Sequence, residues 1–164
     1  MGPARARDGM YRELTPGTTR RILASRGAAA VAADARSHDE ENMTTTNELA
    51  RFFEEGWNRH DLDRLMTFMA DDCVFESTAG PEACGMRHAG RERVRDAFAR
   101  VFAVFPDARF DEARHFVAGE RGVSEWVFRG TRADGTKLEV NGCDLFTFAG
   151  GKIARKSSYF KARA

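Results

Sequence analysis

The second half of the sequence contains four strand-length segments in a row, each joined to the next by a short turn. The segments cover residues 108–117, 123–131, 136–148 and 152–161. Apolar and polar residues alternate along them, which is the pattern of a sheet with one buried face. Turns as short as these join antiparallel neighbours. We therefore predict an antiparallel sheet whose inner face needs a cover.

Three helical segments precede the sheet and can supply that cover. They are predicted at residues 45–57, 61–70 and about 91–105. Thr45 and Glu48 fit a capping box at the start of the first helix, and Asp61 can cap the second. A strand at residues 73–77 and a glycine-containing loop at 78–90 separate the last two helices. Helices and strands grouped in this way indicate an α+β fold.

Residues 1–42 differ in composition from the rest of the chain. Tyr11 is their only aromatic residue, and no apolar period runs through them. Such a segment buries too little surface to offset the entropy lost on ordering. We expect a disordered leader, or a stretch upstream of a true start at Met43 rather than Met1, and a domain over residues 43–164.

The cysteines and the leader bear on localisation. Three cysteines without a close pair indicate reduced thiols and a cytoplasmic protein. The alternative is export, because residues 19–23 resemble a twin-arginine motif and residues 33–35 a cleavage site. Arg26 and Gly27 interrupt the apolar stretch that an export signal needs, so we favour the cytoplasm.

Charge and motifs exclude several classes of partner. The 26 basic and 25 acidic residues give a net charge of +1, which provides no large field for nucleic acid or anionic lipid. No run of eighteen apolar residues occurs. The four histidines lack metal-binding spacing, and no nucleotide-binding glycine motif is present. We expect no metal, no cofactor, no nucleic acid and no membrane partner.

Several stretches together resemble a known family. They are residues 52–62, 70–76, 90–94, 142–148 and 151–153. In order and spacing they resemble the SnoaL-like branch of the nuclear transport factor 2-like superfamily, which includes ketosteroid isomerase. The resemblance implies a conical barrel of three N-terminal helices packed on a curved, mainly antiparallel sheet, with a pocket at its wide end. It also implies homodimers formed through the outer sheet face.

A pocket between such a sheet and its helices would be mostly apolar, as small-ligand sites are. The candidate lining residues are Phe53, Trp57, Phe75, Phe98, Trp126, Phe128, Phe146, Lys156, Ser158 and Phe160. The alternative is that these aromatic residues simply form the core.

Asp144 is the first candidate for chemistry. It shares a strand face with apolar residues such as Val140 and Phe146. Desolvation there would raise the pKa of the carboxyl group and keep it protonated, as a hydrogen-bond donor. By the resemblance, Asp144 falls where ketosteroid isomerase has its oxyanion-stabilising acid.

The alternative for Asp144 is a structural ion pair with Lys156 or Arg155 across the last hairpin. A two-residue turn at residues 150–151 places Ser157 opposite Asp144, whereas a bulged turn places Lys156 there. The sequence leaves both registers open.

Ser77 and His88 complete the candidate catalytic set. By the resemblance, the isomerase's general base corresponds to Ser77 and its tyrosine to Phe53. A serine without an activating base does not remove a proton from carbon, so we do not expect steroid isomerisation. His88 lies in the glycine-containing loop and can act as an acid or base with Asp144 or Ser77, or remain a solvated loop histidine.

Two functions follow from these residues. One is a protein that binds a small hydrophobic carbonyl compound, polyketide-like or steroid-like, and acts as a cofactor-free acid–base isomerase or cyclase. The other is a noncatalytic ligand-binding or dimerisation module. The predicted outer sheet face, which includes Val123, Val127 and Leu145, suits a homodimer interface.

Overall fold

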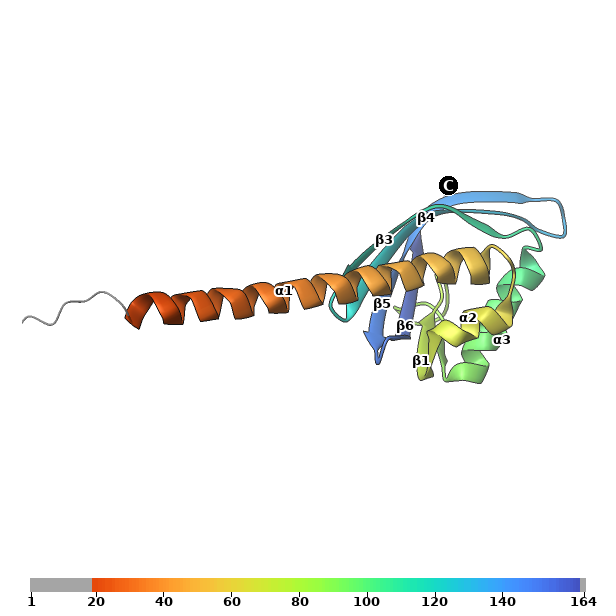
Figure 1. The fold of residues 1–164 in the computed structure, drawn as a ribbon. Coiled ribbons are helices and arrows are strands. Elements are labelled where there is room, and N and C mark those ends of the chain that lie inside the picture. The colour runs from red at the N-terminus through yellow and green to blue at the C-terminus, as the bar shows by residue number, and fades with distance from the viewer. Residues whose placement is uncertain (1–18, 163–164) are drawn as a thin grey trace, which may run out of the picture. The chain divides into compact units, whose positions relative to one another are not determined.

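The computed structural model describes residues 19–162 (Figure 1). Its helices are α1 (Thr19–Arg51), the π-helical segment η1 (Phe52–Trp57), α2 (Leu62–Phe68) and α3 (Arg91–Val104). Its strands are β1 (Met69–Glu76), β2 (Arg87–Ala89), β3 (Arg109–Ala118), β4 (Arg121–Thr131), β5 (Lys137–Ala149) and β6 (Lys152–Phe160). The chain divides after Ser37 into two compact units, and the unit that begins at His38 contains the whole sheet.

The six strands form one open, curved sheet in the order β2-β1-β6-β5-β4-β3. Neighbouring strands are antiparallel, except that β1 and β6 are parallel. Helices α2 and α3 lie on one side of this sheet (Figure 1). The α+β class and the curved, mainly antiparallel sheet predicted from the sequence are confirmed. β4 also shows the expected period, because every second residue from Gly122 to Gly130 is buried.

The core between helices and sheet is built around aromatic rings. Phe52 is fully buried and lies at its centre. Edge-to-face contacts at centroid distances of 5.5–6.4 Å join its ring to those of Phe53, Trp57, Phe68, Phe98 and Phe146. Such contacts add to the free energy gained from burying the rings.

Segment η1 brings several side chains into this core. A π-turn is wider than an α-turn, and Phe52, Phe53, Gly56 and Trp57 are all buried within its six residues. A Cβ atom on Gly56 would lie 2.4 Å from the Leu65 side chain, so glycine at this position allows α2 to pack closely.

The predicted start of the first helix is wrong. α1 runs without a break through Thr45, whose hydroxyl donates to the Glu41 carbonyl at 3.0 Å instead of capping a helix start. Residues 19–42, expected to be disordered, are therefore helical, whereas residues 1–18 lie outside the described part. Alanine, arginine and glutamate favour helix even where no apolar stripe exists. The Asp61 cap is confirmed, since its carboxylate accepts from the Arg64 N–H at 2.8 Å.

Two strand boundaries also differ from the prediction. β1 begins at Met69, in residues expected to finish the second helix. β2 lies inside the predicted loop and pairs with the end of β1, so that His88 stands opposite Phe75. A three-residue strand is too short to show a period in the sequence.

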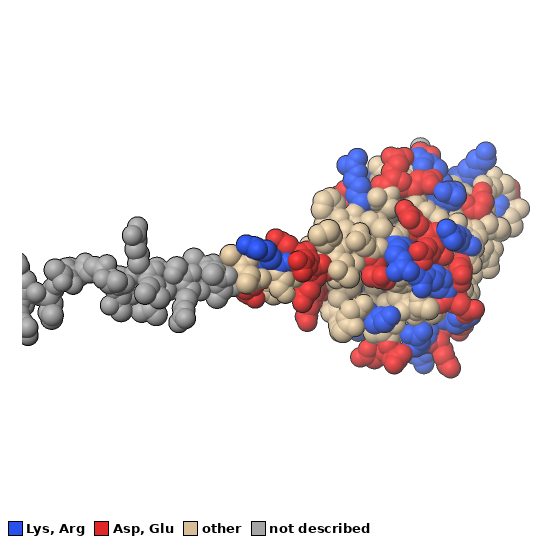
Figure 2. Space-filling model, in the orientation of Figure 1, with Lys and Arg blue, Asp and Glu red and all other residues tan. Residues whose placement is uncertain are grey.

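Charges of both signs are mixed on the surface. Figure 2 shows acidic and basic side chains side by side over the displayed face of the globular part. Ion pairs such as Arg95–Asp63 at 2.7 Å and Arg64–Glu55 at 2.7 Å account for part of this mixing. Within residues 19–162, no helix is both long enough and apolar enough to cross a membrane.

The contact between Asn42 and the β3–β4 turn gives a first test of the extended helix. The Asn42 side chain accepts a hydrogen bond from the Gly119 N–H at 2.9 Å. We expect Asn42→Ala to lower the free energy of unfolding by about 1 kcal/mol, because it removes this bond. Asn47→Ala, at an exposed position of the same helix, is the control and should change it by less than about 0.5 kcal/mol. Urea unfolding of both variants measures the difference, and equal effects would contradict a specific bond.

Candidate functional site

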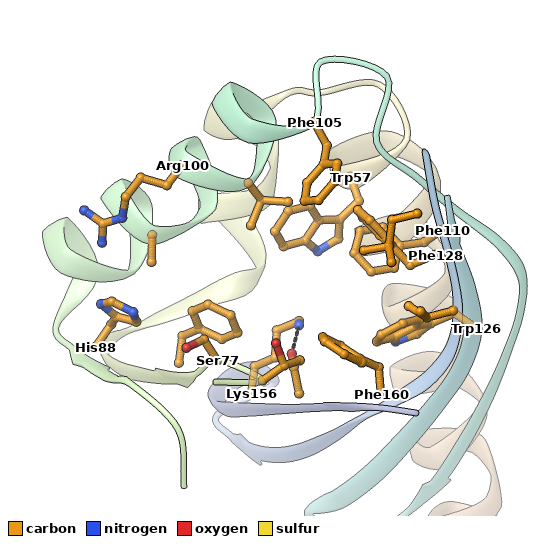
Figure 3. Close-up of a pocket in the computed structure, with 17 residues that line it drawn as sticks. Trp57, Ser77, His88, Arg100, Phe105, Phe110, Trp126, Phe128, Lys156 and Phe160 are labelled. Atoms are coloured by element: carbon orange, nitrogen blue, oxygen red, sulfur yellow. Dashed lines mark hydrogen bonds between the residues drawn. The ribbon is translucent and has the colours of Figure 1, made fainter. Parts of the chain in front are cut away.

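A cavity of about 280 Å³ lies between α3, η1 and the inner face of the sheet (Figure 3). Its walls are mainly aromatic and aliphatic. They are formed by Trp57, Phe75, Ser77, Thr78, His88, Ala97, Arg100, Val101, Phe105, Phe110, Trp126, Phe128, Leu138, Val140, Lys156, Ser158 and Phe160. Seven of the ten lining residues proposed from the sequence are in this set.

The other three candidates, Phe53, Phe98 and Phe146, do not line the cavity. Each is at most 1% exposed and packs against Phe52 in the core. The period of a helix or strand identifies an inward face, but it does not separate inward residues that meet other side chains from those that meet a cavity.

Several lining residues were missed by sequence reasoning, among them Arg100, Phe105, Phe110 and Leu138. Phe110 had a usable signal, because it alternates with polar neighbours on β3. Arg100 had none, because the arginines of α3 alternate with acidic residues in the sequence and so indicate a solvated face.

The register of the last hairpin differs from both alternatives left open above. Thr147 pairs with Arg155, but Phe148 pairs with Ile153, so β6 contains one extra residue between these pairs. This bulge places Ser158 opposite Asp144. Lys156 lies two residues away on the same face, within reach of the carboxylate.

Asp144 is fully buried and accepts three hydrogen bonds. Lys156 Nζ donates to Oδ1 at 2.8 Å, the Ser158 hydroxyl donates to Oδ1 at 2.5 Å, and Trp126 Nε1 donates to Oδ2 at 3.0 Å. Lys156 Nζ also donates to Ser158 Oγ at 2.7 Å. Asp144 is not among the residues that line the cavity, and its contact with Lys156 is the structural ion pair, one of the two alternatives that the sequence left open.

Gly142 makes room for the Trp126 bond to Asp144. Trp126 and Gly142 face each other on β4 and β5. A Cβ atom on Gly142 would lie 2.2 Å from the Trp126 ring. With no side chain there, the indole lies across the sheet and its N–H reaches the carboxylate on the next inward position.

Lys156 presents its amine to the cavity from the sheet (Figure 3). Its nitrogen lies 4.9 Å from the Phe75 ring centre and 5.6 Å from that of Trp57. Burial lowers the pKa of Lys156, and the charge and hydrogen bond of Asp144 oppose that shift. The lysine is 2% exposed, so little water reaches it.

Trp57 supplies a second N–H group. Its indole nitrogen is the one buried side-chain nitrogen or oxygen atom of the described residues that has no hydrogen-bond partner. Trp57 is 1% exposed, and Figure 3 shows this nitrogen turned toward the cavity. An unpaired buried donor costs about 1–3 kcal/mol, so a group that accepts from it would bind favourably.

Ser77 and His88 lie on the side of the cavity away from Trp126 (Figure 3). The Ser77 hydroxyl donates to the Ala79 carbonyl at 2.9 Å. The His88 ring stacks on Phe75, and burial together with the Arg100 charge lowers its pKa. Among the described residues, no hydrogen bond joins either of them to Asp144. The structure therefore does not assemble the three candidates into one catalytic group.

Glu76 lies on the opposite face of the sheet, as strand alternation predicts for a neighbour of Phe75. Arg155 donates to its carboxylate at 2.6 Å and Arg87 at 3.3 Å. Burial would raise the pKa of Glu76, but hydrogen bonds from Arg155 and Ser157 outweigh it and the pKa is lowered. Arg155 is thus occupied by Glu76 and is not the partner of Asp144.

Metal ligation has no support within residues 19–162. No group of three or more His, Cys, Asp or Glu side chains there could hold a metal ion.

Comparisons with known proteins agree with the fold. Residues 49–156 match the model of the SnoaL-like domain. A nuclear transport factor 2-like protein of unknown function from Mesorhizobium loti is 33% identical, with a TM-score of 0.58 over 72% of this chain and 92% of that one. No curated protein sequence matches the chain.

Two structures with lower sequence identity share the fold. A protein provisionally assigned as a polyketide cyclase, from Xanthomonas campestris pv. campestris, is 21% identical, with a TM-score of 0.66 over 74% of this chain and 93% of that one. TerC, co-crystallised with polyporic acid, is 19% identical, with a TM-score of 0.60 over 72% of this chain and 92% of that one.

The Asp144–Lys156 pair can be tested by stability. Asp144→Asn leaves a buried ammonium without its counter-charge, and we expect it to lower the free energy of unfolding by about 3–5 kcal/mol. The double variant Asp144→Leu with Lys156→Met removes both charges and should be more stable than Asp144→Asn by about 2 kcal/mol. Denaturant unfolding measures both values. An Asp144→Asn variant as stable as the parent protein would indicate a protonated Asp144 instead.

Proposed function

The chain belongs to the family of SnoaL-like domains, and on that premise we propose that it binds a small apolar compound carrying a carbonyl oxygen. The ligand would occupy the cavity between α3 and the sheet. Its ring or chain would contact the aromatic walls, and its oxygen would accept from the N–H groups of Trp57 and Lys156.

The observation that carries this proposal is the unpaired indole N–H of Trp57 beside the Lys156 amine in an otherwise apolar cavity. Sites for small molecules combine apolar walls with a few fixed polar groups. Both groups are hydrogen-bond donors, so the complementary ligand atom is an acceptor. A volume of about 280 Å³ suits a compound of one or two rings.

Two donors on one carbonyl oxygen would also favour chemistry at that carbonyl. Charge that develops on the oxygen, as in an enolate, is stabilised by fixed donors in a water-poor site. His88 is the lining residue suited to act as a base, because its lowered pKa keeps the imidazole neutral near pH 7. This would make the protein a cofactor-free isomerase or cyclase acting on a polyketide-like or steroid-like compound.

A second candidate function is ligand binding without catalysis. No Asp or Glu is among the residues that line the cavity, and Asp144 is occupied by its three donors. A site whose lining has no carboxylate base can retain a carbonyl compound without turning it over. Turnover of a bound ketone, followed as exchange of its α-hydrogens in D2O, separates the two candidates.

We also propose that two copies pair through the outer face of the sheet. Phe116 is 58% exposed and Tyr159 is 51% exposed. Both lie on this face, where Phe116 pairs with Val123 and Val123 pairs with Leu145. An apolar area on an otherwise charged surface is typical of an interface, and a twofold axis would cover both copies at once.

The ligand proposal predicts a difference between a ketone and its hydrocarbon. Indan-1-one carries the acceptor oxygen and indane does not. We expect Trp57→Phe to weaken indan-1-one binding about 5- to 10-fold, the equivalent of one hydrogen bond, and to change indane binding far less. Titration calorimetry on the parent protein and the variant measures this. Equal losses for both compounds would show that the indole acts through its shape alone.

The interface proposal predicts that a single charge introduced on the outer sheet face weakens the dimer. Leu145→Asp would bury a carboxylate between copies, and we expect it to raise the dimer dissociation constant at least about 100-fold. Thr136→Asp, in the exposed β4–β5 turn, is the matched control and should leave the constant unchanged. Sedimentation equilibrium measures both variants. A parent protein that is monomeric at micromolar concentration would refute the interface.

A further inference from the structure

We propose that Lys156 is a nucleophilic amine that condenses with the carbonyl carbon of the bound compound and holds it as an iminium ion. This inference rests on the proposed function, because it requires a carbonyl compound in the same cavity. It goes further by assigning a covalent step and by restricting the ligand to aldehydes and unhindered ketones.

The position of the amine supports a covalent role. Lys156 Nζ lines the cavity between the Phe75 and Trp57 rings, at 4.9 and 5.6 Å from their centres. Its hydrogen bonds to Asp144 and to Ser158 leave one of its three N–H directions for the cavity. A carbonyl carbon placed there would meet the nitrogen directly.

Proton transfer has a route that avoids the cavity. Asp144 Oδ1 lies 2.8 Å from Lys156 Nζ and is shielded from the cavity, so it can take a proton from the ammonium without contacting the ligand. Ser158 lines the cavity and bonds to both Lys156 and Asp144. Its hydroxyl can therefore pass a proton between the carboxyl group and the ligand.

The steps balance without any further reactant. Asp144 takes one proton from the Lys156 ammonium, and the free amine pair forms a C–N bond while the C=O π electrons move to oxygen. That oxygen takes a second proton from nitrogen, which gives a neutral carbinolamine. Asp144 then returns its proton through Ser158 to the hydroxyl group, the C–O bond breaks, and water leaves. The nitrogen pair forms the C=N bond, so an ammonium and a ketone have become an iminium ion and water.

The surroundings of Lys156 favour imine formation at this lysine over the same reaction at the other lysines. The charged or titratable groups that face the cavity with it are His88 from β2 and Arg100 from α3, and Asp144 from β5 lies behind it. Burial lowers the pKa of Lys156, which raises the fraction of free amine. The other three lysines are Lys137, Lys152 and Lys161, and all are exposed.

Reductive trapping tests the proposal on the full chain. The protein is incubated with trans-cinnamaldehyde and sodium cyanoborohydride at about pH 6.5, where exposed lysines with a pKa of about 10.4 are almost entirely protonated. We expect one reduced adduct per chain, located by peptide mass mapping on Lys156 with at least tenfold preference over every other lysine. Excess trans-β-methylstyrene, the hydrocarbon of the same shape, should suppress it.

Two variants serve as controls. Lys156→Arg keeps a cation that does not form an imine, and it should abolish the adduct. Lys152→Arg, an exposed position on the same strand, should leave the adduct unchanged. The competition by trans-β-methylstyrene uses the parent protein, so the test remains decisive if Lys156→Arg does not fold.

The outcomes separate this inference from the proposed function. If cinnamaldehyde raises the Tm of the parent protein but no Lys156 adduct forms, the ligand site stands and the covalent role is overturned. Label spread evenly over the four lysines would also overturn it. If neither cinnamaldehyde nor trans-β-methylstyrene raises the Tm and no adduct forms, the proposed ligand site fails together with the inference.

Discussion

The buried ion pair between Asp144 and Lys156 is the interaction on which the inner face of the sheet depends. Two charges removed from water are tolerated only when their remaining hydrogen-bonding groups are also satisfied. Ser158 and Trp126 provide the additional donors to the carboxylate. Gly142 in turn makes room for the Trp126 ring. The pair therefore holds side chains of β4, β5 and β6 in place. It also determines which polar groups of the sheet face the cavity.

As a consequence, hydrogen-bond donors line the cavity, whereas the nearby carboxylate acceptor does not. The carboxylate of Asp144 lies behind the sheet's inner surface, whereas the Lys156 amine and the Trp57 N–H open into the cavity. The family resemblance led us to expect the reverse, with the acid of Asp144 acting on a ligand. One residue of difference in the β6 register accounts for the change, because it brings Ser158 opposite Asp144 and Lys156 beside it.

Segment η1 carries its N–H donor at another position than the one that the resemblance indicated. The resemblance places the isomerase's tyrosine at Phe53, which here is fully buried against Phe52 and has no polar group. The N–H group that reaches the cavity comes from Trp57, four residues later in the same π-helical segment. Residue-by-residue comparison finds the loss at position 53, and only the packed structure shows the donor at 57.

Apolar periodicity in the sequence indicated the fold class, the strand faces and seven of the seventeen residues that line the cavity, because it is a local property that records which side of an element is buried. It thus placed Asp144, Phe146 and Trp126 on the inner face correctly. The tertiary structure alone decided the bulge in β6, the pairing of β2 with β1 and the partner of each buried polar group. These depend on contacts between residues far apart in the chain, where a shift of one residue exchanges Ser157 for Ser158 opposite Asp144.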